Sequence, residues 1–191
     1  MRLFVAIFPS PEVVDALQTA ISRLSKDLPP KAIRWTAPHQ IHLTLNFLGS
    51  VEIGRIADFE TVLLSASAQF VCHDLRATGL GCFPNAKRAR TVWAGLSGDL
   101  ESLQNLKRYL DQSFEKLDYV PETRAFHPHL TIGRVAELRP GQSQLLQREI
   151  HALEQTDFGQ WRVRQIELVQ SALSPNGATY TAIKSFPFIG A

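Results

Sequence analysis

The spacing of apolar residues divides the chain into strands and helices. Residues 3–8 are almost continuously apolar and predict a buried first strand. Ser10 and Pro11 then suit the start of a helix, and apolar residues recur at helical spacing until Pro29 and Pro30 stop it. We therefore expect a strand followed by a long helix at the beginning of the chain.

The rest of the pattern predicts three more helices and several strands. Apolar residues recur at three- and four-residue steps in segments near 53–68, 103–117 and 145–153. Further strands are expected at 41–48, 75–83, 91–96, 130–135, 161–171 and 179–186, the last two forming a hairpin around Ser174-Pro175-Asn176-Gly177. The order of strands and helices has no strict βαβ rhythm, so the predicted class is α+β rather than a doubly wound sheet.

Length and composition fit one folded domain. The 191 residues are 45% hydrophobic and 20% charged, which is enough apolar material for a core and argues against disorder. No segment rich in Gly, Ser or Pro divides the chain, so we expect a single domain over residues 1–191. Nothing in the sequence demands more than a monomer, and no obligatory protein partner is expected. No apolar run approaches the ~20 residues of a membrane span.

Charge and cysteine content narrow the function classes. The formal net charge is +2, which excludes a protein that coats long duplex nucleic acid but leaves room for a small basic site. Cys72 and Cys82 form no CxxC pair, so neither a disulfide framework nor a structural zinc site is expected. With no disulfide framework expected, a reducing cytoplasm is the expected location. The first residues indicate a buried strand and are too short for a signal peptide.

One tetrapeptide pattern, His–apolar–Thr–apolar, occurs twice. It stands as His42-Leu43-Thr44-Leu45 in the first half and as His129-Leu130-Thr131-Ile132 in the second. Because side chains alternate along a strand, each copy would bury its aliphatic pair and present an imidazole beside a hydroxyl. One copy alone would indicate no more than a half-buried strand. Two copies half a chain apart predict two lobes related by a pseudo-twofold axis, with their polar faces meeting across a cleft.

Two imidazoles and two hydroxyls facing one cleft suit phosphoryl transfer. The ordinary imidazole pKa is ~6.5, so one ring can act as general base and the other as general acid near neutral pH. Thr44 and Thr131 can donate hydrogen bonds to non-bridging phosphate oxygens. The motifs lack the neighbouring carboxylates of a magnesium or two-metal site, although His127 and His129 leave a metal pair open as an alternative.

With their flanks, the motifs resemble the 2H phosphoesterase superfamily, which is named for two His-x-Thr/Ser-x motifs. Residues 34–49 and 126–134 resemble the two motif blocks of its bacterial and archaeal RNA 2′,3′-cyclic phosphodiesterase branch, also known as the 2′-5′ RNA ligases. The resemblance covers nearly the whole chain. It implies a bilobal α+β fold in which two antiparallel sheets, with helices outside, line a V-shaped cleft.

The resemblance also implies an activity that needs no metal and no nucleotide cofactor. Terminal ribose 2′,3′-cyclic phosphates would be hydrolysed to 2′-phosphates, and a weak, reversible 2′-5′ RNA ligation is associated with the family. His129 would accept the proton of the attacking water and His42 would donate one to the leaving oxygen, with the exchanged roles as an alternative. RNA ends or cyclic-phosphate nucleotides would be the substrates. Another cyclic phosphate, such as ADP-ribose cyclic phosphate, and nucleotide binding without catalysis are the competing functions.

Three further residues are candidates for substrate binding. Arg134 stands where the RNA branch carries a phosphate-contacting arginine, but strict alternation puts it opposite His129 unless Gly133 forms a bulge or the strand ends there. Phe8 and Trp35 are candidates for stacking on a nucleobase, with core packing as the alternative for both.

The sequence also separates an expected core residue from an expected surface cluster. Phe47 is a further candidate for stacking on a nucleobase, but it shares its parity with the core-facing leucines of the first motif, so we expect it in the core. Lys87, Arg88 and Arg90 form the densest basic cluster, in the loop over residues 84–90. This loop could guide an RNA backbone, and an ordinary solvated loop is the alternative.

Overall fold

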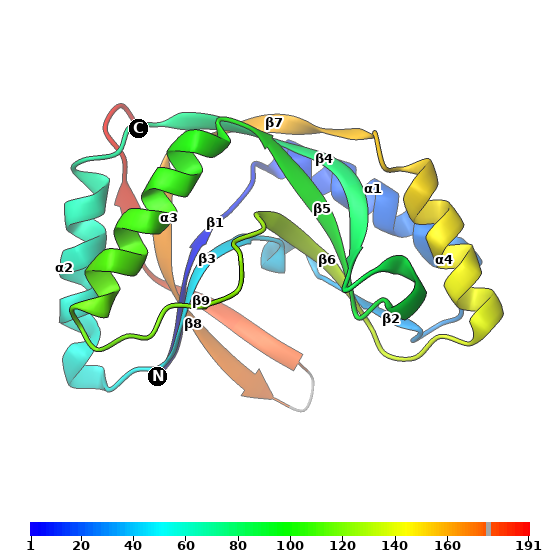
Figure 1. Cartoon of the computed structure of the whole chain (residues 1–191), viewed down its shortest axis with the longest axis horizontal. Coiled ribbons are helices and arrows are strands. Elements are labelled where there is room, and N and C mark those ends of the chain that lie inside the picture. Colours follow the sequence, from blue (N-terminus) through cyan, green and yellow to red (C-terminus); the bar gives the residue numbers. More distant parts are fainter. Residues whose placement is uncertain (175–176) are drawn as a thin grey trace.

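The computed structural model describes residues 1–174 and 177–191. It has the predicted α+β class, with four α-helices packed on one face of a curled antiparallel sheet (Figure 1). The helices are α1 (Pro11–Asp27), α2 (Ile56–Ser67), α3 (Leu100–Glu115) and α4 (Pro140–Ala152), with short 3-10 helices η1 (Pro38–Gln40), η2 (Ile53–Arg55) and η3 (Ala86–Arg88). The strands are β1 (Arg2–Ile7), β2 (Ile33–Trp35), β3 (Leu43–Ser50), β4 (His73–Phe83), β5 (Thr91–Gly98), β6 (His129–Val135), β7 (Asp157–Val163), β8 (Gln165–Ser174) and β9 (Gly177–Pro187).

The observed strands differ from the predicted ones in two places. The three-residue β2 was not predicted, because so short a segment carries no periodicity. The strand predicted at 161–171 was wrong: it is two strands, since β7 pairs with β4 whereas β8 pairs with β1. A change of pairing partner is a property of the tertiary structure and leaves the local apolar pattern intact. The turn residues Pro175 and Asn176 of the predicted hairpin lie outside the described residues.

The sheet consists of two halves that meet at a single residue pair. The hydrogen-bonded order is β7-β4-β5-β6-β3-β1-β8-β9, and β2 also pairs with β6. β3 and β6 are joined through Leu43 and Leu130, which we call the junction. The two predicted sheets are therefore continuous. We call β3, β1, β8 and β9 the first half, and β7, β4, β5, β6 and β2 the second half.

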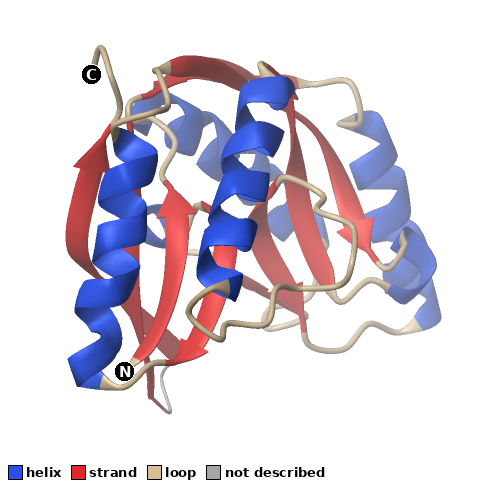
Figure 2. Ribbon diagram, turned by 60° about the vertical axis from the view of Figure 1, so that its left-hand side comes forward, coloured by secondary structure: helices blue, strands red, loops and turns tan. Residues whose placement is uncertain are grey.

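Each half of the sheet is covered by its own pair of helices. α2 contacts β8 and β9 and α3 contacts β3, whereas α1 contacts β7 and α4 contacts β4. Figure 1 shows α2 and α3 together on one side of the molecule, and Figure 2 shows the same two helices side by side in front of the strands. α1 follows β1 of the first half in the chain but covers the second half. The helices and strands of each half therefore do not form one continuous segment of the chain.

The apolar positions that predicted the helices form the core under them. In α1 the buried residues include Val13, Leu17, Ile21 and Leu24, as the helical spacing predicted. In α3, Asp99 caps the helix by accepting a hydrogen bond from the Ser102 backbone N–H at 3.0 Å, and four apolar side chains are fully buried, each contributing ~1.5–3 kcal/mol. These four are Leu103, Leu106, Leu110 and Phe114. None of the helices in the described residues has the length and hydrophobicity to cross a membrane.

Candidate active site

The two tetrapeptides lie side by side at the junction. Leu43 and Leu130 are opposite each other in antiparallel strands and both are buried under the helices. In this register each histidine lies across from the threonine of the other motif. The polar side chains occupy the face of the sheet that the helices leave uncovered. We call this face, which carries His42, Thr44, His129 and Thr131, the histidine face.

Both imidazoles are held in the same way by their own chain. The Nδ1 atom of His42 lies 2.7 Å from the Gln40 carbonyl oxygen, and that of His129 lies 2.6 Å from the His127 carbonyl oxygen. A carbonyl oxygen can only accept, so each Nδ1 carries a hydrogen and donates it. Each Nε2 is thereby the nitrogen that can take up or release a proton. The pseudo-twofold relation between the motifs thus extends to the orientation of the rings.

Aromatic rings of the first half pack around His42. The ring centroid of His42 lies 4.9 Å from that of Phe4, 5.7 Å from that of Phe8 and 5.2 Å from that of Tyr180. Phe4 is almost completely buried, whereas Phe8 and Tyr180 are half-buried. Of the two predicted stacking residues, Phe8 is therefore brought to a candidate catalytic histidine.

His129 has an aromatic environment in the second half. Its centroid lies 5.0 Å from that of Phe83, whose ring stands edge-on at 85°, and 6.4 Å from that of Trp93. Phe83 and Trp93 also pack on each other, at 5.1 Å. Both histidines are consequently enclosed by apolar rings.

This enclosure lowers the basicity of both rings. Burial lowers the pKa of His42 to about 4, with repulsion by Arg134 and His129 adding to the effect and the Gln40 carbonyl opposing it. Burial likewise lowers the pKa of His129 from its ordinary value, with repulsion by His127 and then by Arg134 adding to the effect and the His127 carbonyl opposing it. Both rings are therefore neutral at neutral pH without substrate. An anion between them would favour the protonated forms and raise both pKa values.

A β-bulge brings Arg134 to the histidine face. Along β5, the partner of Trp93 is Thr131 but the partner of Val92 is Gly133, so Ile132 is an extra residue in β6. The bulge restores Arg134 to the face of His129, which the sequence predicted only on condition of such an irregularity. Its repulsion of both histidines shows that the guanidinium lies within electrostatic reach of them.

β3 contains the same irregularity after the same number of residues, and here it overturns a prediction. Thr44 is opposite Ala6 and Asn46 is opposite Val5, so Leu45 is the extra residue. The bulge moves Phe47 to the histidine face, where 65% of its surface is exposed. The expectation that Phe47 lies in the core was wrong because it assumed strict alternation.

Trp35 is not brought to the histidines. It lies opposite Gly133 in β2, and a Cβ atom on Gly133 would stand 2.8 Å from its ring. The ring is half-buried against the main core, on the same side as Ile33. The prediction that Trp35 stacks on a nucleobase is corrected to core packing, since its position in β2 points it toward the helices.

The predicted basic loop lies at the Arg134 end of the second half. Lys87, Arg88 and Arg90 are all exposed, and η3, which contains the first two, packs against α4. Thr91, the residue after the loop, is the strand partner of Arg134. The loop therefore borders the histidine face without contributing to its centre.

Comparisons with known proteins agree with this arrangement. The family model described as LigT like phosphoesterase matches residues 7–93 and 96–180, and each segment contains one tetrapeptide. The chain belongs to the LigT-like 2H phosphoesterases. It is 31% identical to the RNA 2′,3′-cyclic phosphodiesterase of Methanothermobacter thermautotrophicus, over 97% of this chain and 98% of that protein. An RNA 2′,3′-cyclic phosphodiesterase of Archaeoglobus fulgidus is also 31% identical, over 97% and 99% of the two chains.

A solved structure extends the likeness to three dimensions. The protein TT0787 of Thermus thermophilus superimposes with a TM-score of 0.81 at 28% identity, over 100% of this chain and 99% of that one. The predicted resemblance to the 2H phosphoesterases and the predicted fold class are thus confirmed.

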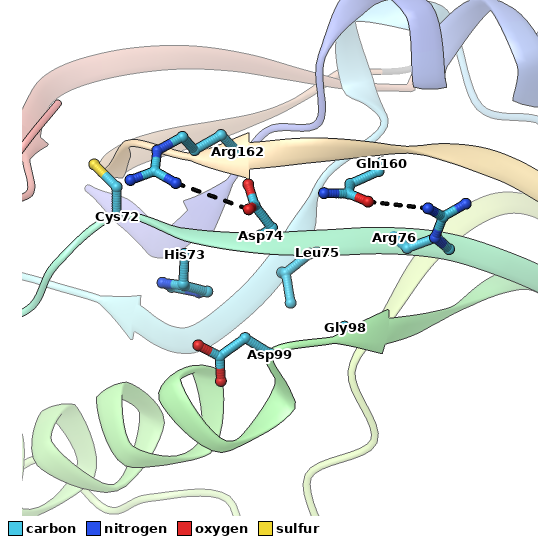
Figure 3. A pocket seen from close by; sticks show the side chains of 9 residues that line it. All are labelled: Cys72, His73, Asp74, Leu75, Arg76, Gly98, Asp99, Gln160 and Arg162. Carbon is cyan, nitrogen blue, oxygen red and sulfur yellow. Dashed lines mark hydrogen bonds and ion pairs between the residues drawn. The ribbon is translucent and has the colours of Figure 1, made fainter.

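This LigT-like phosphoesterase also has a polar cavity away from the histidine face. It has a volume of about 350 Å³ and lies between the start of β4, β7 and the beginning of α3 (Figure 3). Its two arginines already have partners: Arg162 lies 3.8 Å from Asp74, and Arg76 donates to Gln160 at 2.9 Å and pairs with Asp157. The cavity therefore offers no unpaired arginine to an anion.

The geometry does not favour the alternative of a metal pair. Within residues 1–174 and 177–191, His, Cys, Asp and Glu form no group of three or more that could hold a metal ion. His127 is exposed, and its contact with His129 is made by the main-chain carbonyl.

The sequence did not point to several residues around the histidines. Phe4 could have been found, since it shares parity with Phe8 on the first strand. Tyr180 and Trp93 come to the site only through strand pairing, which no local pattern reveals.

Proposed function

We propose that this LigT-like phosphoesterase hydrolyses RNA 2′,3′-cyclic phosphate ends to 2′-phosphates by two-histidine acid–base catalysis without a metal. The observation that carries the proposal is the matched setting of His42 and His129, each with Nδ1 bound to a carbonyl and Nε2 left for proton transfer. The names of the relatives, RNA 2′,3′-cyclic phosphodiesterases, support the reaction class.

In the proposed reaction His129 acts as base and His42 as acid. Nε2 of His129 takes a proton from water as the water oxygen bonds to the cyclic phosphorus. The bond between phosphorus and the 3′-oxygen breaks, and Nε2 of protonated His42 donates a proton to that oxygen. The products are a 2′-phosphate and a 3′-hydroxyl. The pseudo-twofold arrangement suits either direction of proton transfer, and this assignment follows the family resemblance.

Three further groups hold the phosphate in this proposal. Thr44 and Thr131 lie beside the histidines and donate hydrogen bonds to the non-bridging oxygens. Arg134 supplies a fixed guanidinium charge. The bound phosphodiester anion raises the low pKa of His42, so that binding itself favours the protonated acid.

We also propose that the same groups can join RNA ends. If the 5′-hydroxyl of a second RNA takes the place of water, His129 removes its proton and its oxygen attacks the cyclic phosphorus. His42 again protonates the leaving 3′-oxygen. The product is a 2′-5′ phosphodiester, and the reverse reaction restores the cyclic phosphate.

Aromatic and basic residues at the edges of the histidine face complete the proposed RNA site. Phe8 and Phe47 present rings on which a terminal base can stack, because Phe8 packs on His42 and Phe47 lies beside Phe4, which packs on His42. The loop residues Lys87, Arg88 and Arg90 attract the RNA backbone. Reversing these three charges should raise KM for RNA oligomers and leave a cyclic mononucleotide almost unaffected.

Both cysteines support the cytoplasmic location that we include in the proposal. Cys72 and Cys82 are buried free thiols. Burial raises the pKa of the Cys82 thiol to about 11, so little reactive thiolate is present at neutral pH.

Product analysis by NMR tests the proposal directly. A 2′,3′-cyclic nucleotide is incubated with the protein in EDTA, and the phosphorus and ribose signals are followed. The expected product is the 2′-phosphate, with H42Q and H129Q each slower by at least ~100-fold, in line with the loss of a general acid or base. A 3′-phosphate product, or wild-type turnover in either variant, would sink the two-histidine scheme, and loss of activity in EDTA would sink its metal independence.

A further inference from the structure

The two halves of the sheet carry different chemistry at equivalent places of the histidine face. Phe47 follows His42 by five residues in the first half, and Arg134 follows His129 by five residues in the second. Each reaches the face through a bulge after the motif threonine. At this equivalent place the first half therefore carries an aromatic side chain and the second half a cationic one, although the strands that form them are related by the pseudo-twofold axis.

A second arginine stands beside Arg134. β2 pairs with β6 so that Arg34 is directly opposite Arg134. Opposite residues of antiparallel strands share one face, with Cβ atoms ~4.5–5.5 Å apart. Trp35, the next residue of β2, packs toward the core, which places Arg34 on the histidine face. Like charges in this position repel each other and destabilise the pairing.

No carboxylate balances these two charges in the described residues. Arg34 and Arg134 are both exposed, and neither has an acidic side chain within 4.0 Å. The arginines of the cavity in Figure 3 differ in this respect, because each of them has an aspartate partner. The fold holds the two guanidinium groups close together despite their repulsion, and no carboxylate of the described residues neutralises their charge. Such a pair is suited to binding an anion.

The two arginines act differently on the histidines. Arg134 repels both His42 and His129, whereas Arg34 is not among the groups that change either pKa. Arg34 also reaches toward the hairpin of β8 and β9, since its Nη1 lies 4.0 Å from the place of a Cβ atom on Gly177. Arg134 is thus positioned for the reacting phosphate and Arg34 for an anion next to it.

We infer that Arg34 binds the phosphodiester on the 5′ side of the nucleotide that carries the cyclic phosphate. This inference rests on the proposed function and refines it, because it makes the end of a single-stranded RNA, rather than a free cyclic nucleotide, the preferred substrate. A guanidinium can hold two oxygens of such a phosphate by parallel charge-assisted hydrogen bonds. The RNA chain then leaves the site over β2, past the two arginines.

Three substrates with the same cyclic-phosphate terminus test the role of Arg34. They are a cyclic mononucleotide, a dinucleotide with a natural linkage and a dinucleotide with a neutral methylphosphonate linkage. For Arg34→Ala we expect about a tenfold lower kcat/KM on the natural dinucleotide, typical of one exposed charge-assisted contact, and a change within about twofold on the mononucleotide. For the wild type, kcat/KM should be about tenfold lower on the methylphosphonate dinucleotide than on the natural one. For Arg34→Ala, the two dinucleotides should have the same kcat/KM.

Control variants separate the contact from effects on folding. Arg34→Ala should melt at or above the wild-type temperature, because it removes repulsion from Arg134. Arg34→Lys should retain part of the preference for the natural dinucleotide. Arg108→Ala, which removes an exposed arginine of α3, should behave as wild type on all substrates.

The outcomes distinguish the inference from the function on which it rests. Equal losses of Arg34→Ala on the mononucleotide and the natural dinucleotide would overturn the role of Arg34, and so would full activity on both. A wild type that turns over none of the three substrates would instead refute the proposed function.

Discussion

At the scale of single residues, the chain itself orients the histidines and the fold decides their charge. The carbonyls of Gln40 and His127 stand two residues before the rings that they orient, so this contact is local. The burial that lowers the pKa of His42 to about 4 comes from strands distant in the chain, and so does the charge of Arg134. The pH dependence of the reaction is thus a property of the folded site.

The lowered pKa values predict an acidic optimum for the free enzyme. The proposed reaction needs one neutral and one protonated histidine, a form most populated between the pKa of about 4 of His42 and the lowered pKa of His129. kcat/KM for a cyclic mononucleotide should therefore peak below pH 6.5 and fall as rising pH removes the acid's proton. An optimum of kcat/KM above about pH 7 in the pH–rate profile would contradict these values.

Removal of Arg134 should change both rate and pH dependence. Arg134→Ala should lower kcat/KM on a cyclic mononucleotide by roughly 10- to 100-fold, the worth of charge-assisted hydrogen bonds to phosphate. It should also move the optimum to higher pH, because both histidines lose a repelling charge and their pKa values rise. Arg134→Lys keeps the charge and should keep the wild-type optimum. An unchanged optimum in Arg134→Ala would show that the guanidinium does not act on the histidines.

Phe47 should affect binding without affecting stability. Because 65% of its surface is exposed, Phe47→Ala should change the free energy of unfolding by less than about 0.5 kcal/mol. The loss of one stacking platform, worth ~1–3 kcal/mol per base, should raise KM for an adenine-terminated cyclic substrate by roughly 5- to 100-fold. Val120→Ala, at another exposed apolar position, is the control. Equal KM values in both variants would speak against stacking on Phe47.

At the scale of elements, the two bulged strands determine which side chains reach the site. One extra residue follows the motif threonine in each strand, Leu45 in β3 and Ile132 in β6, and it reverses the alternation of the residues directly after it. Arg134 and Phe47 reach the histidine face for this reason. The close packing of β2 on β6 then holds the bulged part of β6, since Ile33 and Trp35 cover Gly133.

Gly133 should be required for this packing. In Gly133→Ala the new Cβ atom would stand 2.8 Å from carbons of both Ile33 and Trp35, so we expect a loss of about 1–3 kcal/mol of stability. Gly141→Ala is a matched control, because nothing lies within 4 Å of its Cβ position in α4 and alanine favours a helix. Urea unfolding measures both variants. Equal stability of Gly133→Ala and the wild type would contradict the packing of β2 on β6.

At the scale of the whole molecule, the repeat in the sequence is not the same as the two halves of the sheet. The matched segments 7–93 and 96–180 each contribute strands to both halves. The first segment supplies α1 to the second half and α2 to the first half. One connected apolar core runs under both halves. Neither repeat can bury its helices without the other.

The molecule should therefore unfold as one unit. We expect a single calorimetric transition with equal calorimetric and van't Hoff enthalpies, because both repeats contribute strands to each half and the two halves share one core. Residues 1–95 expressed alone should lack a cooperative transition, since they lack β6 and α3. Two separate transitions of the whole protein would show that the halves are independent domains.

The sequence by itself determined the features that depend on neighbouring residues. The apolar stripes located the helices, and the alternation within each tetrapeptide placed its aliphatic side chains in the core. The repetition of the histidine and threonine pattern indicated one shared site. These inferences succeeded because helical and strand periodicity is local.

Only the tertiary structure decided the features that depend on strand pairing. The bulges that turn Phe47 and Arg134 toward the site, the division of the predicted strand at 161–171, and the pairing of Arg34 with Arg134 are matters of register between distant segments. Register is set by which strands meet and by where an extra residue is accommodated, and no window of sequence contains that information. The histidines and threonines that meet at the junction could thus be named from the sequence, whereas the positions of Phe47 and Arg134 beside them arose from the fold.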